Sequence, residues 1–137
     1  KNVMHATRDV PPFLDLMKRL GADPYTTPVS CPQSTGYGGA MGPSQFIAST
    51  WKLYENKLKV NLGVATPDPW MAQHAIMATA LFLKDLKADR QTYSAEREAA
   101  GRYYAGGNWQ KSGLGYASSV LTYAEKYQND IDFLKGV

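Results

Sequence analysis

Residues 38–51 read GGAMGPSQFIASTW, and this stretch decides how the rest of the chain is interpreted. Its glycines allow the backbone to approach a ligand closely. Pro43 is favoured at the first position of a helix, so we expect a helix to begin there. The amides of its first turn and the side-chain amide of Gln45 would then point into the same space. The stretch therefore predicts a ligand-facing turn that leads directly into a helix.

Apolar residues recur at helical spacing on both sides of this stretch. The helix that begins at Pro43 should continue to Gly63. Residues 22–42, which precede it, have the composition of a long loop without periodic apolar positions. An earlier helix should follow a capping Asp9 and end before Gly21. The N-terminal half of the chain thus predicts two helices joined by a long irregular segment.

Three further helices are expected in the C-terminal half. An Asp-Pro step at residues 68–69 should begin a central helix that runs to about residue 86 and is apolar around much of its surface. Ser94 should cap the next helix, which ends near Ala105 at a glycine-rich loop over residues 106–108. The last helix carries one apolar stripe, formed by Tyr116, Val120, Tyr123, Tyr127, Ile131 and Leu134. No segment alternates with period two, so we expect an all-α fold with almost no sheet.

The composition suits one globular domain of 137 residues and narrows the classes of partner. A net charge of +3 from scattered basic residues lacks the clustering of a nucleic-acid footprint. No apolar run is long enough to span a membrane. Nine Tyr and three Trp offer faces for sugar rings, although bases stack on the same faces. A lone Cys31 leaves three readings open: a reduced buried thiol, an unpaired thiol, or a partner outside this chain.

Three ordered blocks closely resemble the lytic transglycosylase family: residues 38–51, DPWMAQHAIMATALFLKD at 68–85, and GRYYAGGNW at 101–109. The resemblance covers the chain from Arg8 onward and is to the branch typified by membrane-bound lytic transglycosylase B. It implies a lysozyme-like helical domain that cleaves the β-1,4 bond between N-acetylmuramic acid and N-acetylglucosamine in peptidoglycan, with a 1,6-anhydro product. It also implies no cofactor and an extracytoplasmic location: periplasmic, cell-wall associated or secreted.

The resemblance also indicates substrate-binding residues, and Gln45 is the first of these because its amide would bond a sugar N-acetyl or hydroxyl group. Helical neighbours point about 100° apart, so Tyr103 and Tyr104 cannot face the same surface, and we expect Tyr104 at the substrate. The full set is Gln45, Tyr104, Met41, Ser44, Tyr37 and Asn108. The family usually has a compact Tyr-Asn pair, from which YYAGGN departs. We expect residues 38–45 to form one wall of the largest groove, with Gln45 exposed to it and Tyr104 facing it.

Cleavage by a transglycosylase needs one acid, because the carbon-6 hydroxyl of the sugar replaces water. In the family this acid is a Glu upstream of the GAMG turn, and no Glu precedes that turn here. Glu55 follows it among lysines, which is typical of a solvated helix face. The resemblance therefore places the catalytic Glu before Lys1 and makes these residues the C-terminal part of a longer domain. The missing segment or another chain would then cover the central helix at 68–86.

Two other functions fit parts of the pattern. A glycan-binding module that has lost its acid would keep the aromatic and amide contacts without cleaving the strand. A basic helical nucleic-acid binder would show steeply salt-dependent affinity, and we do not expect one. His5 and His74 lack nearby ligands at metal spacing, so we interpret both as structural and expect no metal. The serines lack a His and Asp partner arrangement, which argues against a nucleophilic-serine enzyme.

Overall fold

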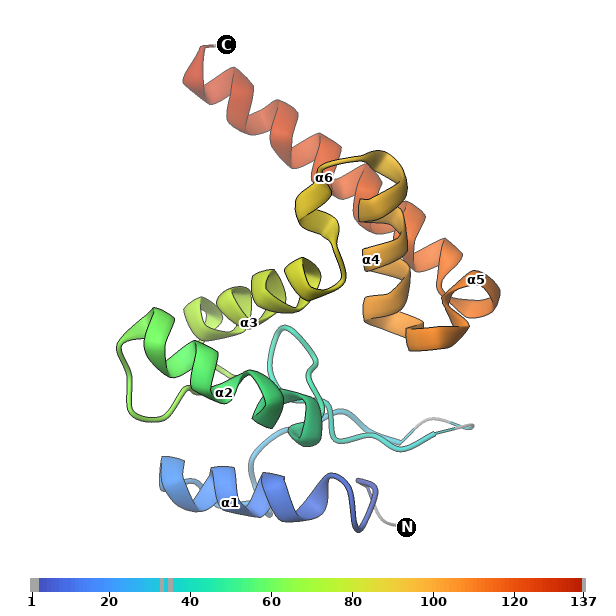
Figure 1. Cartoon of the computed structure of the whole chain (residues 1–137). Helices are drawn as coiled ribbons and strands as arrows, with labels where there is room; N and C mark the ends of the chain where they lie inside the picture. Colours follow the sequence, from blue (N-terminus) through green and yellow to red (C-terminus); the bar gives the residue numbers. More distant parts are fainter. Residues whose placement is uncertain (1–2, 33, 35, 137) are drawn as a thin grey trace. The chain divides into compact units, whose positions relative to one another are not determined.

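The computed structural model describes residues 3–32, 34 and 36–136 (Figure 1). The chain forms two compact units, residues 1–80 and 81–137. Among the described residues the regular structure is helical. No strand forms there, and extended pairing is limited to isolated bridges that join Met41 to Val29 and to Phe46. The expectation of an all-α chain is confirmed.

Helix α1 spans Val10–Leu20 and ends at Gly21, whose φ of 66° suits glycine. Asp9 stands at the predicted cap position, but its side chain makes no capping bond to α1. Its carboxylate instead accepts a 2.6 Å hydrogen bond from the hydroxyl of Ser49, in the first turn of the next helix. The predicted role was therefore wrong: Asp9 links two helices, a contact across 40 residues that no local pattern reveals.

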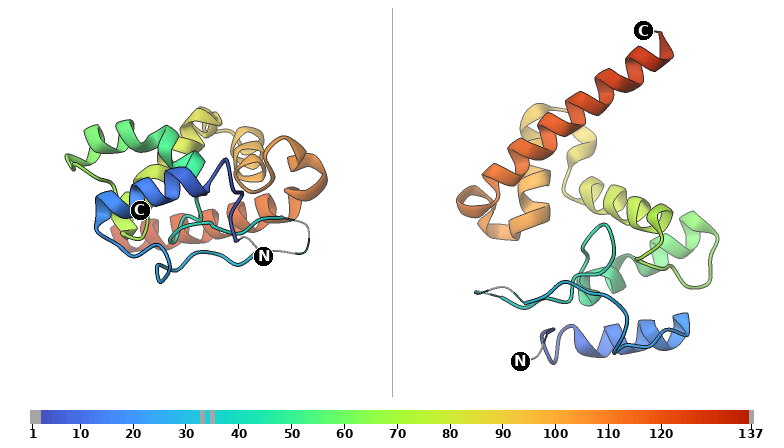
Figure 2. Two further views of the ribbon diagram at one scale, coloured as in Figure 1. Left: turned by 90° about the horizontal axis from the view of Figure 1, so that it is seen from below. Right: turned by 180° about the vertical axis from the view of Figure 1, so that it is seen from behind.

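Helix α2 spans Ala48–Leu62 and ends at Gly63, as expected. Its predicted start at Pro43 was wrong, because Gly42 and Gln45 have φ values of 58° and 55°, which a right-handed helix excludes. Residues 42–45 form a turn instead, and Phe46 pairs with Met41. The buried face of α2 is the predicted one and includes Trp51, Tyr54 and Leu58. Both views in Figure 2 show α1 beside α2, which agrees with the contacts between these helices.

Helix α3 spans Ala72–Asp85 and so begins later than the Asp-Pro step predicted. The carboxylate of Asp68 accepts a 2.8 Å hydrogen bond from the amide of Trp70, and this local turn delays the helix. The buried residues of α3 are small or polar ones: His74, Ala75 and Ala78. Ile76 is 69% exposed, so part of the apolar surface of this helix faces solvent.

Unit 2 continues through a 3-10 turn η1 (Ala88–Arg90), α4 (Tyr93–Ala105), a 3-10 turn η2 (Gly106–Asn108), α5 (Trp109–Ser112) and α6 (Leu114–Lys135). Thr92 caps α4 by accepting a hydrogen bond from the amide of Ala95, so the prediction that Ser94 caps it was wrong. The end of α4 at Ala105 is confirmed. Residues 106–108, which were predicted to form a glycine-rich loop, form a 3-10 turn that leads into α5.

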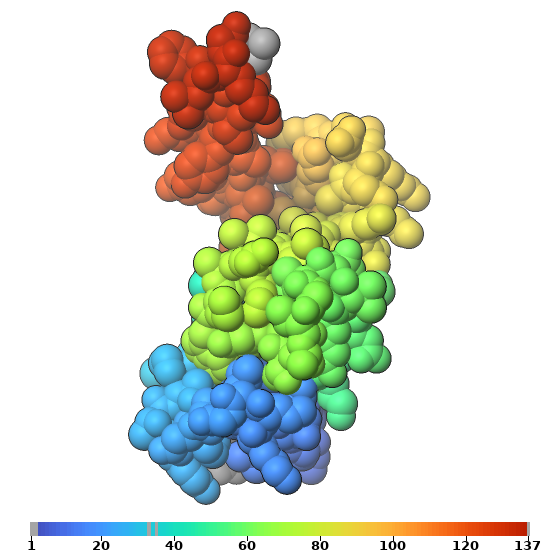
Figure 3. All heavy atoms as spheres, turned by 90° about the vertical axis from the view of Figure 1, so that its left-hand side faces the viewer, coloured from blue at the N-terminus to red at the C-terminus, as the bar shows by residue number. Residues whose placement is uncertain are grey.

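Helix α6 has 22 residues and contacts α4 closely, as both views in Figure 2 show. Small buried residues on the two helices permit the close approach: Ala99, Ala100 and Gly101 on α4, and Ala117 on α6. The predicted helix is confirmed, but most of its apolar stripe is exposed, including Tyr123, Tyr127, Ile131 and Leu134. In Figure 3 the C-terminal end of α6 projects beyond the yellow segment of the same unit.

Candidate functional site

The first sequence block forms a tight turn rather than the start of a helix. The amide of Met41 donates a 2.9 Å hydrogen bond to the carbonyl of Phe46, and the amide of Gln45 donates to the carbonyl of Gly42. Both Gly42 and Gln45 lie in the left-handed region. A glutamine adopts that region only at a cost, and such strained positions are concentrated at functional sites. The fold thus holds Gln45 in an uncommon conformation at the surface.

Gly42 packs directly against the backbone that precedes α3. A Cβ atom on Gly42 would overlap the carbonyl oxygen of Pro69, so no larger residue fits without moving one of the two segments. Trp70 follows, and its indole nitrogen donates a 3.0 Å hydrogen bond to the carbonyl of Pro28. The turn, the start of α3 and residue 28 are therefore fixed together around one surface hollow.

This hollow has a volume of about 300 Å³ and is open to solvent. Gln45 is exposed there, and its side-chain amide donates a 2.8 Å hydrogen bond to the carbonyl of Gly42. The lining combines an indole, an amide and backbone groups, which suits a ligand with both polar groups and a flat apolar face. The residues that line the hollow are Pro28, Val29, Ser30, Ala40, Gly42, Gln45 and Trp70. None of them is acidic.

The other predicted residues of unit 1 have different surroundings. Met41 is fully buried, so it packs in the core and does not line the surface as expected. The hydroxyl of Ser44 donates a 2.8 Å hydrogen bond to the carbonyl of Ala75 and so fixes the turn to α3. Tyr37 is exposed and lies 5.0 Å, centroid to centroid, from the ring of His5. The structure therefore places Gln45 at the hollow but gives Met41 and Ser44 structural contacts.

In unit 2 the two neighbouring tyrosines face different surroundings, as the helical spacing predicted. Tyr103 is partly buried and packs on Phe82 at a centroid distance of 5.3 Å. Tyr104 is 59% exposed and stacks on Tyr116 of α6, with centroids 4.9 Å apart and planes inclined by 14°. Asn108 is exposed on the η2 turn. Tyr104 is thus the member of the pair that is accessible to a ligand.

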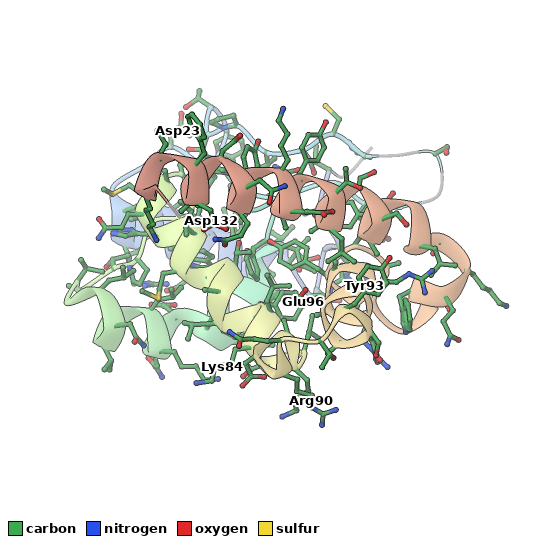
Figure 4. The ribbon with its side chains drawn as sticks, turned by 90° about the horizontal axis from the view of Figure 1, so that it is seen from above. Asp23, Lys84, Arg90, Tyr93, Glu96 and Asp132 are labelled. Atoms are coloured by element: carbon green, nitrogen blue, oxygen red, sulfur yellow. The ribbon has the colours of Figure 1, made fainter. Side chains whose placement is uncertain are left out.

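A second and larger hollow lies within unit 2, between α4 and α6, and has a volume of about 590 Å³. Tyr93 and Glu96, labelled in Figure 4, contribute to it from the start of α4, and Thr122 and Gln128 contribute from α6. None of the predicted site residues lines it. Of these two hollows Gln45 therefore lines the smaller one, and sequence patterns locate turns but not the volume between packed helices.

Among the residues that the structure describes, two carboxylates are buried, and neither burial was expected. Burial alone would raise the pKa of Asp9, but hydrogen bonds from Arg8 and Ser49 and the charge of Arg8 outweigh it, so the pKa lies below its ordinary value. Burial likewise opposes ionisation of Glu55, while hydrogen bonds and charge from Lys59 and Arg19 bring its pKa below the ordinary value. The description of Glu55 as a solvated surface charge was wrong, since Arg19 bonds both of its oxygens.

These pKa shifts limit the chemistry of both groups. A general acid must hold its proton at the working pH, which requires a pKa near that pH. Asp9 and Glu55 are instead held ionised by their partners, so they stabilise the packing of α1 on α2 and are unsuited to donating a proton. The sequence signal for their burial is weak because Ser49, which bonds Asp9, and Arg19, which bonds Glu55, lie 40 and 36 residues away.

The histidines have structural contacts: Nδ1 of His74 accepts a hydrogen bond from the amide of Asp68, and Nδ1 of His5 accepts one from the amide of Arg8. In the described part of the chain no group of three side chains could hold a metal ion. Cys31 is exposed and free. Within that same part, no helix has the length and apolar character needed to cross a membrane. No protein-family model, curated protein or solved structure matches this chain.

Proposed function

We propose that this chain binds the glycan strands of peptidoglycan as part of a lysozyme-like lytic transglycosylase domain. The observation that carries the proposal is the strained turn at residues 41–46, which presents Gln45 at a hollow lined by Trp70. An amide bonds the N-acetyl and hydroxyl groups of a sugar, and an indole offers its apolar face. The resemblance of the GGAMGPSQF stretch to the transglycosylase signature supports the same assignment.

Tyr104 is proposed as a second contact residue, from unit 2. Its ring is exposed and held by stacking, which is the arrangement that favours contact with the C–H face of a pyranose ring. Within unit 1 Gln45 offers polar contacts that orient a sugar, and within unit 2 Tyr104 offers an aromatic face for apolar contact. In the proposed reaction the proton donor is a Glu that precedes the GAMG turn in the family.

Binding of chitotetraose, followed by calorimetry or by NMR titration, tests the proposal. Gln45→Ala should weaken binding about tenfold, since removing a hydrogen-bonding partner costs on the order of 1 kcal/mol or more. Tyr104→Ala should weaken it by a similar factor. Gln91→Ala is the matched control, because Gln91 is also exposed and also left-handed, with a φ of 53°, and directly follows the η1 turn. Gln45→Ala and Gln91→Ala therefore make the same change of side chain at positions with similar backbone strain.

Unchanged affinity in both Gln45→Ala and Tyr104→Ala would overturn the assignment of these residues to a glycan site. Competition with DNA at two salt concentrations separates the glycan proposal from the basic nucleic-acid alternative. Nucleic-acid affinity falls steeply with salt because counterions are released, whereas oligosaccharide binding carries no such charge dependence.

A further inference from the structure

The stack of Tyr104 on Tyr116 joins α4 to α6 at the surface of unit 2. Their centroids are 4.9 Å apart and their planes are nearly parallel, at 14°. Tyr104 and Tyr116 remain 59% and 38% exposed, so burial in a core does not explain the arrangement. In a parallel stack each ring covers one face of the other. Because Tyr116 covers one face of Tyr104, the 59% exposure of Tyr104 must come largely from the other face and the edge of its ring.

Two glycines fix the helices that carry these rings. Gly101 lies one turn before Tyr104, and a Cβ atom there would lie 2.8 Å from the Cε3 atom of Trp109. Gly113 lies three residues before Tyr116, and a Cβ atom there would lie 2.6 Å from the carbonyl oxygen of Gly101. The backbones of α4 and the turn before α6 therefore approach each other more closely than any side chain would allow. This contact sets the separation at which the two tyrosines meet.

We infer that Tyr116 is a positioning residue, which holds the ring of Tyr104 in one orientation so that its open face is preformed for a pyranose ring. The inference rests on the proposed function, in which Tyr104 contacts the glycan. A tyrosine on an exposed helix face otherwise samples several rotamers, and binding must then restrict it. A ring already held by a stacked neighbour loses less freedom when the sugar binds. Tyr116 thus contributes to affinity through Tyr104 and does not itself need to touch the sugar.

The test compares chitotetraose binding by the full chain in four variants. Tyr116→Leu removes the stacked ring but keeps an apolar side chain, and it should weaken binding about 2- to 10-fold, the effect of one newly mobile side chain. Tyr116→Phe keeps the ring and should restore most of that loss. Tyr104→Ala should weaken binding at least as much as Tyr116→Leu. Tyr123→Leu is the matched control, because Tyr123 is an exposed α6 tyrosine that stacks on Tyr127 instead.

Ring-proton NMR of Tyr104 provides a readout that general destabilisation would not mimic. In the wild-type chain and in Tyr116→Phe, the Tyr104 resonances should show the shift caused by a stacked ring. In Tyr116→Leu they should move toward rotamer-averaged values while the far backbone amides stay unchanged. This pattern, together with weaker binding in Tyr116→Leu, supports the inference.

Two results would overturn it, and they point to different faults. If Tyr104→Ala loses affinity while Tyr116→Leu binds as the wild type does, Tyr116 has no positioning role and the proposed function stands. If Tyr104→Ala itself binds as the wild type does, the ring of Tyr104 is not a glycan contact. The inference then fails together with that part of the proposed function.

Discussion

Asp9 shows how one side chain couples folding to pH. Its carboxylate is 1% exposed and accepts hydrogen bonds from Arg8 at 2.7 Å and from Ser49 at 2.6 Å. Because the folded-state pKa is below the unfolded value, the ionised group stabilises the fold fully above the unfolded pKa of about 4. That stability is lost as the pH falls through the lower, folded-state pKa. Acid should therefore loosen the contact between α1 and α2.

Asp9→Asn keeps the shape of the side chain and removes its charge. We predict a loss of about 1 to 3 kcal/mol in the free energy of unfolding at pH 7, the usual range for hydrogen bonds to a charged group. As the pH falls toward the folded-state pKa, the wild-type carboxyl also loses its charge, so the difference in stability between the two proteins should narrow. Urea denaturation at pH 7 and at pH 3 measures this difference. Asp15→Asn is the control, since Asp15 is exposed and its ion pair with Arg19 should be worth less than about 1 kcal/mol. A gap between Asp9→Asn and wild type that is as large at pH 3 as at pH 7 would contradict the linkage.

Within the candidate site, the sequence predicted those features that depend only on residues near one another in the chain. The exposure of Gln45 and the contrast between Tyr103 and Tyr104 follow from a turn and from helical geometry. The burial of Glu55 was missed because its main partner, Arg19, lies 36 residues earlier. Local patterns report which face a residue occupies on its own helix, and they do not report which helix covers that face.

At the scale of elements, the contact between α1 and α2 depends on the cluster of Arg19, Glu55 and Lys59. Arg19 donates to both carboxylate oxygens of Glu55, and Lys59 lies 2.8 Å from the first of them. A double-mutant cycle with Arg19→Met and Glu55→Gln should give a coupling of about 0.5 to 3 kcal/mol, as for groups that share one network. Additive effects, measured by the same urea denaturation, would show that the two helices pack independently of this pair.

The approach of α4 to the start of α6 depends on glycine spacing. Gly113→Ala would place a methyl group 2.6 Å from the carbonyl oxygen of Gly101, and we predict a loss of about 1 to 3 kcal/mol, as for other overpacked sites. Gly115→Ala, two residues further on and with open space around it, should stabilise α6 by about 0.5 to 1 kcal/mol. Thermal unfolding should therefore shift in opposite directions in the two variants. A rise in the melting temperature of Gly113→Ala would show that the backbone contact is not tight.

Most helices were predictable, and the errors fall at their starts. Gly21 and Gly63 end α1 and α2 because glycine takes the left-handed cap conformation, which is a local property. Pro43 and the Asp-Pro step at 68–69 suggested helix starts, yet both fall in turns whose backbones pack against each other at Gly42 and Pro69. A proline is favoured in such a turn as well as at the first position of a helix, so its presence does not distinguish the two. Tertiary packing decided between the two outcomes.

At the scale of the whole chain, the division into two units left no mark in the sequence. The boundary between residues 80 and 81 falls inside α3, whose 14 residues contain neither glycine nor proline. Composition changes and linker residues, which usually reveal such boundaries, are absent from that stretch. When a boundary between units falls inside a helix, the sequence predicts one uninterrupted helix and gives no sign of the boundary.

The proposed function leads to a last prediction about these 137 residues as a whole: they should bind peptidoglycan without cleaving it. The hollow at Gln45 has no acidic residue in its lining, and the two buried carboxylates, Asp9 and Glu55, are held ionised by their cationic partners. Without a protonated acid near the glycosidic oxygen, the leaving group cannot be released at a useful rate. Purified peptidoglycan should therefore carry the chain into the pellet, and less of the Gln45→Ala variant should pellet with it. The same suspension should show no loss of turbidity and no soluble 1,6-anhydro sugar by mass spectrometry. Release of such sugars by the wild-type chain at a rate above that of a heat-denatured sample would mean that one of its exposed carboxylates acts as the acid.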